Sequence, residues 1–279
     1  MMPGFFDNKV VWITGASSGI GEALAKEFAQ QGAKLILSAR NENELNRVKE
    51  SCNTAPENVY ILPLDLSLST DIQPKSLWAM ARWERIDYLI NNAGIASRGQ
   101  VVKTEMDVFR KVMETNFFGS IALTKEVLPS MLSKKMGHIV VVSSMAGKLG
   151  SPLLSTYSSS KHALHGFFDT LRTEVRKAGI YITIVVPGFI NTPILVNAMD
   201  EKGEVTGKNL KINENGMSSE KCARKIIQAI KRKKQEALIS GWGKLTVYTH
   251  RFFPALFYRM VSNHPIKKLR RILPIFFKN

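Results

Sequence analysis

The stretch from Val10 to Gly21, with the sequence VVWITGASSGIG, joins an apolar run to a turn that contains Gly15, Gly19 and Gly21. A helix-forming run starts directly after it, at Glu22. Glycines at a strand-to-helix turn let the backbone approach a pyrophosphate, and the N-terminal end of the helix stabilises the negative charge. The spacing G-x-x-x-G-x-G differs from the usual G-x-G-x-x-G fingerprint. The stretch therefore predicts a first β-strand and a phosphate-binding turn, and a glycine turn without a ligand is the alternative.

The same turn also matches the G-x-S-x-G nucleophile elbow of serine hydrolases, with Ser17 as the nucleophile. An elbow normally follows several strands, whereas this one follows the first. It also requires a histidine base, and none of the five histidines stands out as one. Hydrolysis through Ser17 is therefore a remote alternative.

Short β-branched runs and helix-length segments alternate along most of the chain. The predicted strands are residues 9–13, 34–38, 58–63, 86–90, 138–143, 181–186 and 237–240, and the two longest predicted helices are residues 106–132 and 154–177. This alternation predicts an α/β fold, a single Rossmann-type doubly wound parallel sheet of about seven strands with helices on both faces. We expect residues 1–243 to form this domain, residues 188–217 to be a substrate lid, and residues 244–279 to be a basic amphipathic extension.

Composition and charge narrow the class of protein. The chain has 279 residues, 44% of them apolar and 22% charged, as in ordinary globular proteins. The N-terminus lacks the features of a secretion signal, and no window has the ~18–20 apolar residues of a membrane span. Cys52 and Cys222 suggest neither a disulfide framework nor a zinc site. The sequence thus predicts a cytoplasmic protein whose contact with membranes, if any, is peripheral.

The net charge of +16 is concentrated near the C-terminus. Residues 221–279 contain fifteen Lys and Arg and one acid, Glu236, which gives +14. In the run from 245 to 261, the apolar residues Phe253, Leu256, Phe257 and Met260 are spaced as on one helix face, with Arg251 and Arg259 at its edges. A basic cluster, 267–271, and further apolar residues follow. The pattern predicts an interfacial helix on anionic lipid, and packing on the core or a subunit interface is the alternative. Nucleic-acid binding is unlikely, because no recognition module accompanies the charge.

The end of the second predicted strand bears on the choice of dinucleotide. A carboxylate at this point would bind an adenosine ribose, but the sequence is Ser38-Ala39-Arg40. The guanidinium of Arg40 suits a 2′-phosphate, which favours NADP(H) over NAD(H). A solvated surface arginine is the alternative.

A second cluster combines a tyrosine, a lysine and serines. Tyr157 and Lys161 lie at i and i+4 of a predicted helix, so the ammonium can favour the ionised phenol. Ser144 ends the preceding predicted strand, at the sheet edge where ligands bind in such folds. These groups could carry acid-base chemistry on a substrate carbonyl. His162 and His165 lie within one helical turn but have no evident third ligand, so no metal is expected.

Together these motifs resemble the short-chain dehydrogenase/reductase family. The resemblance rests on Thr14 with the glycine turn, Asn91-Asn92-Ala93-Gly94, Asn116, Ser144, Tyr157-x-x-x-Lys161 and Pro187-Gly188, in order and spacing, and covers about residues 7–242. Within the family, the chain is most similar to the hydroxysteroid-dehydrogenase and orphan dehydrogenase/reductase members. The resemblance implies a homo-dimer or tetramer packed through the two longest helices.

The resemblance also implies roles for individual residues. Tyr157 would exchange a proton with the substrate oxygen, Ser144 would orient that oxygen, Lys161 would lower the tyrosine pKa and hold the nicotinamide ribose, and Asn116 would support a water. The cofactor-binding set comprises Gly15, Ser17, Ser18, Gly19, Ile20, Arg40, Asp65, Leu66, Asn91, Asn92, Ala93, Tyr157, Lys161, Pro187, Gly188, Ile190 and Thr192. Asp65 could instead only cap the next segment, and Asn116 only brace the backbone.

The predicted function is an NADP(H)-dependent oxidoreductase that interconverts a ketone and a secondary alcohol on an apolar, steroid-like or lipid substrate. The alternative is a dinucleotide-binding scaffold without turnover, whose basic tail engages membrane lipid or nucleic acid.

Overall fold

The computed structural model describes residues 4–207, 216–241 and 243–262. Its centre is a parallel sheet of seven strands in the order β3-β2-β1-β4-β5-β6-β7. The strands are β1 (Val10–Thr14), β2 (Lys34–Ser38), β3 (Val59–Ile61), β4 (Tyr88–Asn91), β5 (Gly137–Val142), β6 (Ile180–Pro187) and β7 (Glu236–Ile239). Each lies within a few residues of its predicted range. The order runs outward from β1 in both directions, so β1 and β4 flank the point where the chain reverses its direction across the sheet.

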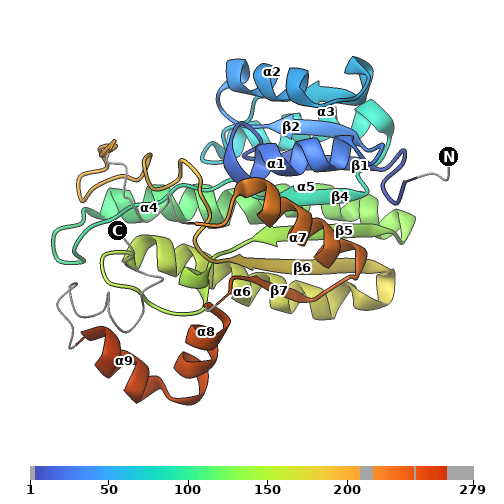
Figure 1. Ribbon diagram of the computed structural model, residues 1–279. Coiled ribbons are helices and arrows are strands. Elements are labelled where there is room, and N and C mark those ends of the chain that lie inside the picture. The colour runs from blue at the N-terminus through green and yellow to red at the C-terminus, as the bar shows by residue number, and fades with distance from the viewer. Residues whose placement is uncertain (1–3, 208–215, 242, 263–279) are drawn as a thin grey trace.

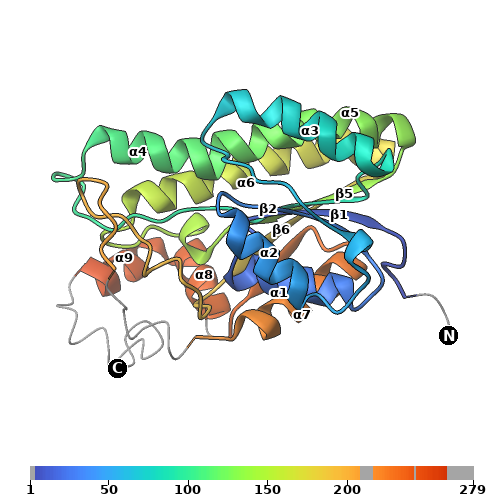
Figure 2. The same cartoon turned by 90° about the horizontal axis from the view of Figure 1, so that it is seen from above.

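Helices cover both faces of the sheet (Figures 1 and 2). The helices on one face are α1 (Gly19–Ala29), α2 (Glu42–Ser51) and α7 (Ser219–Lys231), and those on the other are α3 (Ser69–Trp83), α4 (Met106–Met113), α5 (Gly119–Lys134) and α6 (Ser155–Val175). Short helical turns lie at Pro56–Asn58, Met145–Gly147 and Arg176–Ala178. The prediction of a doubly wound Rossmann-type sheet is confirmed.

Strand β1 is held on both sides by buried polar contacts. All five of its residues are buried, as expected for the centre of a parallel sheet covered on both faces. The indole of Trp12 donates to the Ser38 hydroxyl on β2 at 2.9 Å, and the Asp87 carboxylate before β4 accepts from the Val10 amide at 2.8 Å. These bonds fix the register of β1, and therefore the position of the glycine turn at its end.

The helix predicted over residues 106–132 is interrupted. A π-helical turn at Glu114–Phe118 separates α4 from α5 and contains Asn116. Such single π-turns often occur at functional sites, because the extra residue turns a side chain out of the regular helical series.

The C-terminal extension also differs from its prediction. Instead of one helix over 245–261 it forms two, α8 (Gly243–Phe252) and α9 (Pro254–Ser262). Pro254 has no backbone N–H and disfavours helical backbone at Phe253, so it ends α8 and starts α9. The predicted stripe is split: Phe257 is buried, while Phe253 and Leu256 are exposed. The side chain of Met260 and the basic cluster 267–271 lie outside the described residues. No described helix meets the length and hydropathy that crossing a membrane requires.

Candidate active site

A cavity of about 960 Å³ lies beside the carboxyl ends of the central strands. It brings together nearly all of the predicted site residues: Gly15, Ser17, Ser18, Gly19, Ile20, Arg40, Asp65, Leu66, Asn92, Ala93, Ser144, Tyr157, Lys161, Pro187, Gly188, Ile190 and Thr192. Asn91 and Asn116 are the exceptions, because both are buried behind the cavity wall. The position agrees with the general rule that open α/β sheets bind ligands at this edge.

The glycine turn forms one end of the cavity. Gly15 has a φ of +63°, and a Cβ there would lie 2.7 Å from the Ala93 Cα, so only glycine fits this close approach. The Thr14 hydroxyl accepts from the amides of Asn92 and Ala93, both at 3.1 Å, which joins the ends of β1 and β4. Ser18 precedes α1, and its side chain makes no capping bond to the helix. The turn therefore presents amides and a hydroxyl at a helix N-terminus, which fits a dinucleotide pyrophosphate.

Charged side chains outside the predicted set support this turn. Arg47 of α2 forms an ion pair with Glu22 of α1 at 2.8 Å and donates to the Ser17 carbonyl at 3.2 Å. Lys26 bonds the other oxygen of Glu22 at 2.7 Å. The Arg47 hydrogen bond, helped by Lys26, lowers the pKa of Glu22 to about 2. Because Arg47 lies 25 positions from its partner, the sequence offers no local signal for this network.

Asn91 and Asn116 make buried hydrogen bonds near the cavity. The Asn91 amide donates to the buried Thr124 hydroxyl at 2.9 Å. Asn116 accepts from the Ile95 amide at 2.8 Å and donates to the Ile95 carbonyl and the Ser160 hydroxyl, both at 2.9 Å. The π-turn at Glu114–Phe118 thus ties the segment after β4 to α6. This is the bracing role considered for Asn116, and its proposed role toward a water remains a prediction.

Ser144, Tyr157 and Lys161 line the same cavity. Ser144 follows β5 and bonds the Tyr157 side chain. The Lys161 ammonium is buried, donates to the Val142 carbonyl at 2.9 Å and lies 5.6 Å from the centre of the Tyr157 ring. The i, i+4 spacing on α6 therefore puts the two groups on one face, as the sequence indicated. In this arrangement the Tyr157 hydroxyl can act as a general acid toward a substrate oxygen, and the Ser144 hydroxyl can donate a hydrogen bond to the same oxygen.

The pKa of the tyrosine differs from the expectation. Burial raises the pKa of Tyr157 to about 12, and the hydrogen bond with Ser144 lowers it by less than burial raises it. Burial also lowers the pKa of Lys161 to about 8. The expectation that Lys161 makes the phenol acidic is wrong for the protein without a cofactor, because desolvation dominates and the Lys161 ammonium is directed at the Val142 carbonyl. At neutral pH, Tyr157 is a protonated phenol that can donate.

Arg40 and Asp65 lie at the adenosine end of the cavity. The guanidinium of Arg40 is exposed, and it has no acidic partner within the part of the chain that the structure describes. Asp65 accepts from the amide and the hydroxyl of Ser67, at 2.9 and 2.7 Å, so it caps the next segment and also lines the cavity.

The part of the cavity wall that we call the apolar end is lined by side chains that no motif marks. They are Met145, Leu149, Leu154, Phe189, Ile194, Leu195 and Val205. Gly243 and Thr246 of α8 also line it, so the cavity wall includes the first turn of the C-terminal extension. Arg40, Asp65 and Lys161 are the only charged side chains among the described lining residues.

Comparison with known proteins gives the family. Residues 9–203 match the family described as short chain dehydrogenase. The chain belongs to the short-chain dehydrogenase family. Among curated relatives, a dehydrogenase/reductase SDR family protein 7-like of Drosophila melanogaster is 40% identical over 93% of this chain and 81% of the fly protein. Dehydrogenase/reductase SDR family member 7B of Mus musculus is 38% identical over 95% and 83%. The predicted resemblance to orphan dehydrogenase/reductase members is confirmed.

Solved short-chain dehydrogenases share the whole fold. A Burkholderia phymatum enzyme in complex with NAD superimposes with a TM-score of 0.80 at 25% identity, over 92% of this chain and 96% of that one. A Sphingobium yanoikuyae enzyme in complex with NADPH gives 0.72 at 27% identity, over 82% and 87%. The family is one of oxidoreductases that act on small molecules, and its fold binds both nicotinamide dinucleotides.

The hydrolase alternative finds no support in the site of this short-chain dehydrogenase. No histidine of the described residues lines the cavity with Ser17. His165 bonds the Ser143 hydroxyl at 3.1 Å, and the Nδ1 atom of His162 lies 2.8 Å from the Ser158 carbonyl oxygen. Within the part of the chain that the structure describes, Ser17 therefore lacks the base that an elbow nucleophile requires. The described residues also contain no group of three His, Cys, Asp or Glu side chains that could hold a metal ion.

The buried Lys161 predicts a pH dependence of folding stability. Between pH 8 and 10.5 the folded protein has lost the Lys161 proton while the unfolded chain keeps it, so the free energy of unfolding rises with pH in this window. The rise from this group is up to about 3 kcal/mol. Urea denaturation of the ligand-free protein at pH 8 to 10 should show it. The variant Lys161→Met should lack this rise in the free energy of unfolding, whereas Lys177→Met, at an exposed lysine, should keep it. If the free energy of unfolding depended on pH in the same way in the wild type and in Lys161→Met, the expectation that the buried Lys161 ammonium titrates in this range would be wrong.

Proposed function

We propose that this short-chain dehydrogenase is an NADP(H)-dependent carbonyl reductase that interconverts a ketone and a secondary alcohol on an apolar substrate. The observation that carries the proposal is that Ser144, Tyr157 and Lys161 line one cavity together with the glycine turn and a group of apolar side chains. A bound nicotinamide dinucleotide supplies or accepts the hydride. The residues of the chain must then bind the substrate, orient its oxygen and move one proton.

In the proposed reduction, the Ser144 hydroxyl donates to the substrate carbonyl oxygen and fixes its orientation. Tyr157 donates its phenolic proton to that oxygen as the hydride reaches the carbonyl carbon, which gives the alcohol. The raised pKa of Tyr157 keeps the phenol protonated before the step, as a proton donor requires. The Lys161 ammonium then lies close enough to stabilise the phenolate that forms, until solvent returns the proton.

Apolar substrates fit the lining of the cavity. A neutral, apolar ligand loses little by leaving water, whereas a charged ligand would lack a partner beside Leu149, Leu154 and Leu195. Residues 188–207 supply several of these lining side chains, which supports the proposal that residues 188–217 act as a substrate lid.

Exposed apolar residues on α5 and the turn before it, Phe118 and Leu132, are consistent with the proposed homo-oligomer.

Oxidation of NADPH tests the proposed function directly. The full-length protein is supplied with a panel of steroid ketones, long-chain ketones and small polar ketones, and absorbance at the nicotinamide band is followed. We expect turnover of the apolar ketones. The scaffold without turnover would be favoured if the protein bound the dinucleotide but reduced none of the ketones and, in the reverse direction, oxidised none of the secondary alcohols.

Replacement of Arg40 tests the choice of dinucleotide. A charge-assisted bond from its guanidinium to a 2′-phosphate contributes about 1.5–3 kcal/mol, so Arg40→Ala should raise KM for NADPH at least about tenfold. KM for NADH should stay unchanged, since NADH has no phosphate there. The control is Arg110→Ala, at an exposed arginine of α4 that pairs with Asp107. Unchanged KM values for both dinucleotides would assign Arg40 to the protein surface instead, and equal increases would assign it to a part that both dinucleotides share.

A further inference from the structure

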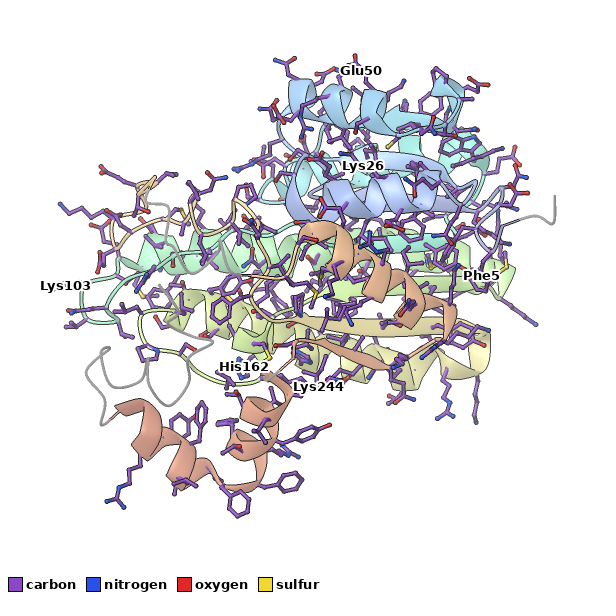
Figure 3. All side chains as sticks on the ribbon, in the orientation of Figure 1. Phe5, Lys26, Glu50, Lys103, His162 and Lys244 are labelled. Atoms are coloured by element: carbon purple, nitrogen blue, oxygen red, sulfur yellow. The ribbon has the colours of Figure 1, made fainter. Side chains whose placement is uncertain are left out.

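Helices α8 and α9 expose an apolar face that no other part of the described chain covers. We call it the α8–α9 face and define it by Leu245, Tyr248, Phe252, Phe253 and Leu256. Phe252 is 70% exposed, Phe253 63% and Leu256 53%. In the view of Figure 1 the two helices lie below the sheet, and Figure 3 shows that part of their side chains point away from the α/β body. Exposed apolar residues gathered in this way mark an interaction surface.

The inner side of the same helices is already packed. Thr246 is buried against the cavity, and Phe257 is buried in the core cluster beside α6. The ring of His250 on α8 hydrogen-bonds the Tyr258 hydroxyl on α9 at 3.0 Å and contacts the Phe257 ring edge-on. Because these contacts fix the two helices to each other and to the body, the outer face cannot turn inward without losing them.

The charged side chains of α8 and α9 are all positive. Lys244, Arg251 and Arg259 are exposed on the two helices, and Figure 3 shows Lys244 near the start of α8. None of the three side chains has an acidic partner among residues 4–207, 216–241 and 243–262. The sequence contains no acid after Glu236. An apolar face with a cationic border is complementary to a layer that has an apolar interior and anionic groups at its surface.

We propose that the α8–α9 face binds the headgroup layer of an anionic lipid membrane, with its aromatic and leucine side chains inserted and its basic side chains on the lipid phosphates. Interfacial helices combine these two features. A second copy of the chain fits less well, since a two-fold interface would bring the same positive border of both copies together with no acid to offset it.

Binding in this way has a consequence for the substrate, which rests on the proposed function. Gly243 and Thr246 belong to the same helix as Leu245 and Tyr248, and they line the apolar end of the cavity. A face docked on lipid therefore holds that end of the cavity near the membrane. Ketones dissolved in the bilayer are then the substrate class that the docked enzyme reaches first.

Sedimentation with vesicles tests the docking without any turnover. The full chain is mixed with vesicles of phosphatidylcholine alone or with added phosphatidylserine, at low and high salt. We expect binding to the anionic vesicles that weakens with salt. The double variant Phe253→Ser, Leu256→Ser should bind at least about tenfold more weakly. The matched control is Leu77→Ser on α3, because Leu77 is 58% exposed and α3 lies on the far side of the molecule from α9.

The charged border is tested by a second pair of variants. Arg251→Glu with Arg259→Glu should weaken binding by about fivefold or more per charge, while Lys177→Glu should leave it unchanged. Wild-type protein that stays in the supernatant with anionic vesicles would overturn the proposal. Normal binding of vesicles by the Phe253→Ser, Leu256→Ser variant would also overturn it. A variant whose main change is a smaller mass by light scattering would overturn it too, because the face would then bind a second copy of the chain. These outcomes do not depend on activity, so they are separate from a failure of the reductase assignment.

Discussion

Replacement of Tyr157 by phenylalanine is expected to lower kcat by about 10²- to 10⁴-fold on the best ketone substrate, the range that general acid catalysis contributes. The change removes one oxygen atom and keeps the ring, so the packing against Lys161 is retained. Loss of the hydrogen bond with Ser144 costs little, because Ser144 also accepts from the Ala146 amide at 3.1 Å. Dinucleotide affinity should therefore change less than threefold, a difference below about 1 kcal/mol.

The measurement separates chemistry from binding. Steady-state NADPH oxidation gives kcat and KM, and a titration followed by nicotinamide fluorescence gives the Kd of the dinucleotide. Tyr181→Phe is the matched control, because Tyr181 lies on β6 at the protein surface and is 41% exposed. An unchanged kcat in Tyr157→Phe would remove the proposed acid, and with it the carbonyl-reductase mechanism. A loss in Kd equal to the loss in kcat would instead assign Tyr157 to cofactor binding.

The sheet was predictable because its strands are buried on both faces. A strand such as β5 is buried along its whole length and is apolar over most of it, so the sequence shows a continuous apolar run, Ile139 to Val142. The glycine turn was predictable for a similar reason, since the close approach of Gly15 to Ala93 tolerates no side chain. Tyr157 and Lys161 are one turn apart on a single helix, so their proximity follows from local geometry alone.

Features that depend on distant contacts were not predictable. The π-turn at Glu114–Phe118 follows from bonds of Asn116 to Ile95 and Ser160, which lie 21 and 44 positions away. The entry of Thr246 into the cavity wall depends on how α8 packs after β7. The break of the tail at Pro254 did have a local signal, because a proline disfavours helical backbone at the preceding residue. The apolar spacing across the break masked that signal.

The pKa of Tyr157 shows a limit of reasoning from spacing. A neighbouring ammonium lowers a phenol pKa only if its effect exceeds the cost of desolvation. Here burial lowers the pKa of Lys161 itself and raises the pKa of Tyr157, so the phenol stays protonated. Burial of the two side chains comes from segments far apart in the sequence, and the i, i+4 spacing contains no information about it.

Replacement of Gly21 by alanine is expected to damage both the fold and the cofactor site. A methyl group at Gly21 would lie 2.1 Å from the Gly15 carbonyl oxygen and 2.7 Å from the Asn92 side-chain nitrogen. That nitrogen donates to the carbonyls of Thr14 and Gly15, at 3.0 and 3.1 Å. The turn must therefore open and lose these bonds. We expect the free energy of unfolding to fall by roughly 2–4 kcal/mol, from overpacking and lost hydrogen bonds, and dinucleotide affinity to fall at least about tenfold.

Urea denaturation and the fluorescence titration measure the two effects in the same samples. Gly166→Ala is the matched control, because a Cβ at Gly166, on the exposed side of α6, meets nothing within 4 Å. That variant should gain about 0.5–1 kcal/mol, the usual benefit of alanine over glycine within a helix. If Gly21→Ala kept wild-type stability and affinity, the close approach of α1 to the Gly15 carbonyl would not be what requires glycine at this position. If Gly21→Ala lost dinucleotide affinity but kept its stability, the strain would be confined to the phosphate-binding turn. The stability of the sheet would then not depend on the conformation of that turn.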